Sequence, residues 1–157
     1  MYHRRLLGVI CLLAACGGQS AGDAARAADP ATSAEGAVRS FLQGVADSNL
    51  ARMATYWGST SGPAIRTNQP PDWERRMVIM QAYLRKAEYK IVSDVGGGAD
   101  AATRGVQVEL RRDQCTRVVP FTTVRAVDGS WIVNQVDLAA AGSPLNPCPK
   151  PSPVDSL

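Results

Sequence analysis

The chain has 157 residues, of which 17 are basic, 14 are acidic and 45% are hydrophobic. This length suits one domain with a modest core. A nucleic-acid-binding domain usually carries a clustered basic face on a strongly basic chain, whereas this chain has a formal net charge of only +3. We therefore expect no nucleic-acid partner.

The first 16 residues have the pattern of an export signal. Arg4 and Arg5 form a short basic start, and residues 6–15 are an uncharged apolar run. The run is shorter than the roughly 20 residues that a membrane-spanning helix needs. Its length and flanks are typical of a secretory signal peptide over residues 1–15.

Small residues lead up to the cysteine at the end of this run, in the order Leu13-Ala14-Ala15-Cys16. The order resembles the lipobox of bacterial lipoproteins, Leu-small-small-Cys. The resemblance implies cleavage before Cys16, acylation of this cysteine, and attachment to a membrane on the exported side, which is the outer membrane if the cell has one. Stable anchoring needs more than one acyl chain, and a lipoprotein cysteine carries enough. An ordinary signal peptide with a chance cysteine and an uncleaved helical anchor are the alternatives.

The remaining cysteines predict a disulfide. With Cys16 carrying lipid, Cys115 and Cys148 form an even pair in an oxidising compartment. Two free thiols are the alternative. Two cysteines without a histidine make a poor zinc site, and the single histidine, His3, lies in the signal region. We therefore expect no metal and no cofactor.

Composition divides the rest of the chain into three parts. Residues 16–32 are small and polar and predict a flexible tether. Residues 33–140 carry the periodic patterns of a folded domain. Residues 141–157 contain five prolines, which excludes helix and central strand and predicts an extended tail. Cys148 would fasten this tail to the domain.

The first half of the domain has helical periodicity. Thr32 or Ser33 can cap a first helix, whose apolar residues recur at three-to-four spacing. A short second helix is expected over residues 50–57 and a loop rich in Gly, Ser, Thr and Pro over residues 58–71. A third helix is expected to begin near Pro71, since proline is tolerated at a helix start.

The second half alternates apolar and polar residues, as half-buried strands do. Strands are expected over residues 89–95, 106–111, 115–127 and 131–138. Asp128-Gly129 is a two-residue hairpin signal, and such a turn places Arg125 opposite Ile132 and Thr123 opposite Asn134. Helices followed by an antiparallel meander predict an α+β fold, with N-terminal helices packed on a curved four-stranded sheet.

This order of elements, closing with Asp-Gly-Ser-Trp-Ile-Val at residues 128–133, resembles the nuclear transport factor 2-like superfamily. The resemblance covers residues 33–140 and implies a cone-shaped domain, although the third helix is long for the family. Some enzymes of the superfamily, such as ketosteroid isomerase, use a carboxylate base with a tyrosine donor. The pair that this chain offers is Asp137 with Tyr56.

Several residues are candidates for a pocket. Aromatic side chains that would line a hydrophobic cavity, or else form ordinary core, are Tyr56, Trp57, Trp73 and Tyr83. Arg125, with Asn134 and Thr123 near it, presents a planar fork of donors for an anionic ligand, although a solvated sheet edge is the plainer interpretation. The paired arginines at 75–76 and 111–112 are interpreted as solvated faces.

The sequence assigns no catalytic residue. Without histidine in the mature chain, the commonest general base at neutral pH is missing, and no nucleophile elbow, phosphate loop or metal-ligand cluster is present. We expect Asp47, Glu109 and Asp137 to be exposed, and the domain to bind an apolar or anionic small molecule or an envelope protein. The alternatives are a small isomerase or hydratase and a structural or assembly subunit.

Overall fold

The computed structural model describes residues 29–96, 101–145 and 148. The expected signal peptide, Cys16 and most of the tether and tail lie outside these residues. The helices are α1 (Ala34–Ala46), α2 (Leu50–Thr55), α3 (Ala64–Thr67), α4 (Trp73–Leu84) and α5 (Leu138–Ala141). The strands are β1 (Gly58–Ser59), β2 (Gly62–Pro63), β3 (Glu88–Val95), β4 (Thr103–Arg112), β5 (Cys115–Arg125) and β6 (Trp131–Val136). Among the described residues, no helix has the length and apolar character needed to cross a membrane.

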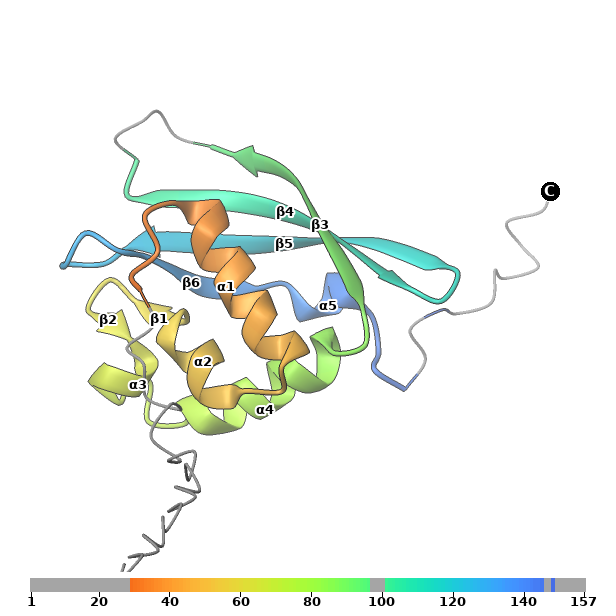
Figure 1. The fold of residues 1–157 in the computed structure, drawn as a ribbon, viewed down its shortest axis with the longest axis horizontal. Coiled ribbons are helices and arrows are strands. Elements are labelled where there is room, and N and C mark those ends of the chain that lie inside the picture. Colours follow the sequence, from red (N-terminus) through yellow and green to blue (C-terminus); the bar gives the residue numbers. More distant parts are fainter. Residues whose placement is uncertain (1–28, 97–100, 146–147, 149–157) are drawn as a thin grey trace, which may run out of the picture.

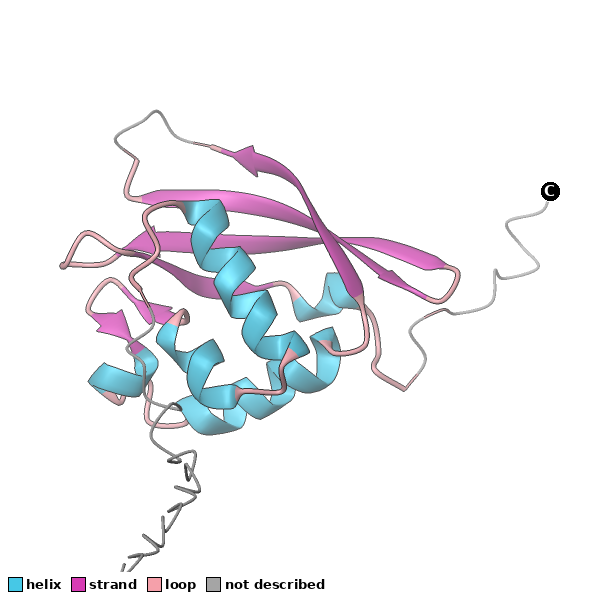
Figure 2. Ribbon diagram, viewed as in Figure 1, coloured by secondary structure: helices cyan, strands magenta, loops and turns pink. Residues whose placement is uncertain are grey.

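The main sheet is an antiparallel meander in the order β3-β4-β5-β6, with helices on one face (Figures 1 and 2). Helix α1 crosses this face and contacts all four strands. The expected α+β architecture is thus confirmed. The sequence accounts for it, because a helix with one apolar stripe and strands with one apolar face bury these surfaces against each other.

Helix α1 begins where the sequence predicts. The side chain of Ser33 accepts a hydrogen bond from the N–H of Gly36 (3.0 Å), which satisfies one of the free donors of the first turn. The apolar face of the helix is buried through Val38, Phe41 and Leu42. Helix α2 follows after a short turn and is capped in the same way by Asn49.

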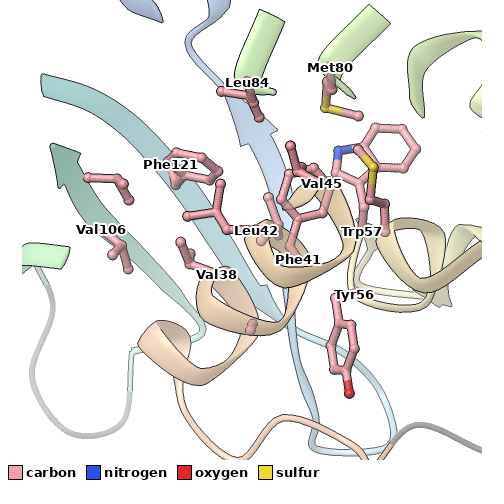
Figure 3. Close-up of a cluster of buried hydrophobic side chains, with 14 of the residues drawn as sticks. Val38, Phe41, Leu42, Val45, Tyr56, Trp57, Met80, Leu84, Val106 and Phe121 are labelled. Carbon is pink, nitrogen blue, oxygen red and sulfur yellow. The ribbon is translucent and has the colours of Figure 1, made fainter. Parts of the chain in front are cut away.

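The core lies between α1 and the sheet (Figure 3). The rings of Phe41 and Phe121 meet edge to face, with centroids 6.3 Å apart. Met53 and Met77 are fully buried in the same cluster. Burial of side chains of this size stabilises the fold by about 1.5–3 kcal/mol each, so the core is the main source of stability.

The turn between β5 and β6 differs from the expectation. The N–H of Ala126 donates to the carbonyl of Ser130 (2.8 Å) and that of Gly129 donates to Ala126 (2.9 Å), so the loop has three residues, Val127 to Gly129. Gly129 occupies the left-handed region at φ +83°, as the last position of a three-residue hairpin loop requires. The prediction of a two-residue turn is wrong.

The longer turn shifts the register of β6. Arg125 lies opposite Trp131 rather than Ile132, and Thr123 lies opposite Val133. An extra residue on β6, Asn134, forms a bulge, and beyond it the strands return to the expected pairing. As a result Trp131 and Val133 join the core, and the expected pairing of Arg125 with Ile132 is wrong.

The expected loop over residues 58–71 contains further structure. The β1–β2 hairpin lies beside β6, because the N–H of Val133 donates to the carbonyl of Tyr56 (2.9 Å) and the side chain of Asn134 donates to the carbonyl of Gly58 (2.8 Å). A Cβ atom at Gly58 would lie 2.3 Å from the carbonyl oxygen of Gly62, so this close approach of two chain segments requires glycine.

The end of the domain also differs from expectation. Strand β6 stops at Val136, and α5 follows where the end of a strand was predicted. The carboxylate of Asp137 caps α5 by accepting a hydrogen bond from the N–H of Ala140 (3.0 Å). Ala141 is buried in the core.

Candidate functional site

The four candidate aromatic residues do not line one pocket. Tyr56 and Trp57 are 6% and 5% exposed and belong to the core. Trp73 is half-buried and its indole N–H donates to the side chain of Asn68 (3.2 Å). Tyr83 is half-buried on α4. None of the four lines either of the two grooves described below.

The proposed acid and tyrosine donor are both engaged elsewhere. The hydroxyl of Tyr56 donates to the backbone carbonyl of Asp29 (3.0 Å), and the exposed carboxylate of Asp137 caps α5. Asp47 is exposed as expected, whereas Glu109 is half-buried on the sheet. An acid tuned for catalysis near neutral pH must be buried beside a suitable donor, and the described contacts give Asp137 no such surroundings.

The β5–β6 hairpin carries a cluster around one indole ring. The guanidinium carbons of Arg125 and Arg104 lie 5.3 and 5.9 Å from the ring centroid of Trp131. Arg104 also pairs with Asp94 at 3.0 Å. Trp131 is only 4% exposed, and cation–π contacts of this kind hold a guanidinium in place. We call this part of the molecule, defined by Arg104, Arg125, Val127, Asp128 and Trp131, the hairpin end.

Thr123 and Asn134, which were expected beside Arg125, form hydrogen bonds elsewhere. The hydroxyl of Thr123 is buried and donates to the carbonyl of Arg104 (3.1 Å), and the side-chain amide of Asn134 donates to Gly58. Both groups therefore satisfy the backbone. Arg125 is exposed and is the candidate whose donors face solvent.

The tip of the hairpin is ordered by an aspartate that the sequence did not single out. Asp128 accepts hydrogen bonds from the hydroxyl (2.5 Å) and N–H (3.0 Å) of Ser130 and pairs with Arg66 of α3 at 2.9 Å. The Ser130 hydroxyl and then Arg66 lower the pKa of Asp128 to about 2. The Asp-Gly turn signal was visible in the sequence, but the partner 62 residues away was not.

The opposite end of the sheet is held covalently. Cys115 and Cys148 are joined as predicted, with Cα atoms 5.7 Å apart. Beside them, the guanidinium of Arg112 donates to the carbonyls of Tyr83 and Ala141. We call these residues, Arg112, Cys115, Ala141 and Cys148, the clasp end.

Arg112 corrects the expectation of a solvated arginine pair. It is half-buried, whereas Arg111 is exposed and pairs with Glu88. Burial, and then the positive charge of Arg117, lower the pKa of Arg112. The carbonyls that Arg112 binds belong to the last turns of α4 and α5, where cations are favoured by the helix dipole.

The described part of the chain has grooves on its surface, of which two are considered for binding. The larger, of about 750 Å³, lies at the ends of α1 and α4 and is lined by Arg85, Lys86, Glu88, Arg111 and Asp113, with apolar neighbours. Its cations are balanced in part by its own carboxylates and by the helix C-termini. The smaller, of about 440 Å³, contains Gln135 and Asp137, and its lining is polar.

Within the described part of the chain, histidine, cysteine, aspartate and glutamate form no group of three that could hold a metal ion. Comparisons with protein families, curated proteins and solved structures found no match to the chain.

Proposed function

We propose that the chain is a lipid-anchored protein of the bacterial cell envelope, held to its membrane by acylated Cys16. Its domain is of the cone-shaped nuclear transport factor 2-like type and acts by binding a partner rather than by catalysis. The order of helices and the antiparallel meander support the fold assignment.

The disulfide between Cys115 and Cys148 is the observation that carries this proposal. Such bonds persist in exported proteins and are rare in the reducing cytosol. Because these two cysteines bond to each other, the cysteine that ends the lipobox-like run is left for lipid. The export signal and the disulfide are independent features of the chain, and both indicate the same compartment.

The preference for binding over catalysis rests on where the titratable groups lie. The tyrosine and acid that would serve an isomerase form other contacts. By contrast, the exposed guanidinium of Arg125 is held over Trp131 with its donors available, and a prepositioned guanidinium suits an anionic partner.

Expression of the full precursor in a bacterial host tests the anchor. The mature protein should enter the membrane fraction, and intact-mass measurement should find acyl groups on an N-terminal Cys16. Cys16→Ser should block processing or release the protein, whereas Cys11→Ser, a matched change inside the apolar run, should leave lipidation unchanged. Cleavage at another site without lipid would contradict the proposal.

A further inference from the structure

The chain enters the domain at the hairpin end. The carbonyl of Ala31 accepts a hydrogen bond from the N–H of Trp131 (2.8 Å), and that of Asp29 accepts one from the hydroxyl of Tyr56 (3.0 Å). In Figure 1 the segment that leads into α1 and the β5–β6 loop lie at the same end of the molecule. Residues 29–31, which the sequence placed in the tether, thus lie against the hairpin end.

The position of Cys16 brings this end close to the proposed anchor. Asp29 follows Cys16 by 13 residues, and a chain of that length spans at most about 45 Å. A surface tethered so closely meets lipid headgroups at an effective concentration on the order of millimolar. A weak contact therefore suffices to orient the domain.

The charges at the hairpin end leave one cation for an external partner. Arg66 and Arg104 each have an aspartate within 3.0 Å. Arg125 forms no ion pair with any residue that the structure describes, and Trp131 supports its guanidinium. Asp29 adds an exposed carboxylate where the chain enters, so the end has little net charge. The expected attraction is local, between the guanidinium fork and a phosphate.

An apolar side chain accompanies this cation. Val127, at the tip of the hairpin, is 85% exposed and lies two residues from Arg125. A lone exposed valine is ordinary on a protein surface. Beside a guanidinium and at the entry of an anchored chain, however, it fits the boundary between lipid headgroups and acyl chains.

We propose that the hairpin end docks onto the phospholipid surface that carries the anchor. The guanidinium of Arg125 donates to headgroup phosphates, and the side chain of Val127 enters the layer just beneath them. This inference rests on the proposed lipid anchor at Cys16. Docking through this end directs the clasp end away from the membrane.

The test uses the full lipidated chain in vesicles of phosphatidylcholine with anionic phosphatidylglycerol, some of whose lipids carry a nitroxide on the headgroup. A fluorescent label is placed by Val127→Cys or, as a matched control, by Val92→Cys on β3, where the valine is also exposed. We expect the headgroup nitroxide to quench the label at position 127 and to leave the label at position 92 nearly unquenched.

Replacement of the cation sharpens this test. A basic side chain at an anionic surface is worth about a fivefold change in population, so Arg125→Gln should lower the docked-to-undocked ratio at position 127 about fivefold. The matched variant Arg75→Gln removes an exposed arginine of α4 and should leave quenching unchanged.

The outcomes separate the docking from the anchor. A chain that sediments with the vesicles but is quenched equally at both positions overturns the docking and leaves the anchor intact. A chain that lacks lipid and stays in the supernatant overturns both. Arg125-dependent binding of inorganic phosphate without vesicles, seen by NMR together with equal quenching, assigns Arg125 to a soluble ligand and overturns the membrane contact.

Discussion

The two ends of β5 are secured in different ways. At the clasp end, a disulfide and a half-buried arginine fasten α4, α5 and the tail to the sheet. At the hairpin end, an indole ring, two guanidiniums and an ion pair hold the turn without a covalent bond. At the clasp end the polar groups bind other parts of the protein, whereas at the hairpin end the cation of Arg125 stays exposed. The comparison indicates that both ends stabilise the fold, but that only the hairpin end leaves a cation available for the partner proposed above.

The largest effect is expected from Trp131→Ala at the hairpin end. Removal of a large buried aromatic side chain usually destabilises a domain by about 3–5 kcal/mol, and here it also takes away the support of Arg125 and Arg104. Urea unfolding would measure the loss. Trp131→Phe keeps an aromatic face and should be milder. A loss below about 1 kcal/mol would show that this ring is not a structural anchor.

Loss of the disulfide should rank next. The bond closes a loop of 33 residues, which in the chain-entropy model stabilises the folded state by about 3–4 kcal/mol. Cys115→Ser combined with Cys148→Ser should lower the free energy of unfolding by this amount, and reduction of the unmodified protein should reproduce the effect. Free thiols at both positions in exported protein would contradict the structure.

Arg112→Met separates the arginine from the disulfide at the clasp end. Two backbone carbonyls lose a charged donor, which should cost about 1–3 kcal/mol, partly offset because the buried charge is removed. Arg111→Met is the matched control, since its exposed ion pair with Glu88 is screened by solvent and its loss should change stability little. Equal losses in thermal unfolding of the two variants would argue against a special role for Arg112.

The smallest effect is expected on the stability of the fold at acidic pH. The folded-state pKa of Asp128 is lowered to about 2 from 3.8, so its contribution is fully present above about pH 4 and is lost as the pH falls through about 2. Asp128→Asn should flatten this part of the stability curve. Arg66→Gln should flatten it only in part, because the hydrogen bonds from Ser130 remain. An unchanged curve in the asparagine variant would place the acid sensitivity elsewhere.

Much of the fold could be predicted from the sequence because it depends on local patterns. The cap at Ser33, the apolar stripe of α1 and the alternation along β4 are each visible within about ten residues. The pairing of Cys115 with Cys148 followed from parity and compartment alone. These features require no knowledge of which surfaces meet.

The side-chain contacts at the clasp end and the hairpin end could not be predicted in this way. The burial of Arg112 depends on the last turns of α4 and α5, which lie far from it in sequence. The position of Trp131 beneath two guanidiniums depends on a turn of three residues and on the bulge at Asn134. One extra residue in a turn shifts the pairing of the next strand and exchanges which side chains lie on each of its faces. The arrangement of side chains at the hairpin end therefore depended on the length of this turn.

The hydrogen bond between Ala31 and Trp131 also affects how the molecule responds to a pulling force. Any pull along the chain from its N-terminal side reaches the fold first at Asp29 and Ala31, where the Tyr56 hydroxyl and the N–H of Trp131 take the load. These two contacts can separate one after the other while the cap at Ser33 keeps α1 in place. We therefore expect the entry segment to detach before α1 and the sheet when the chain is pulled from its N-terminal side.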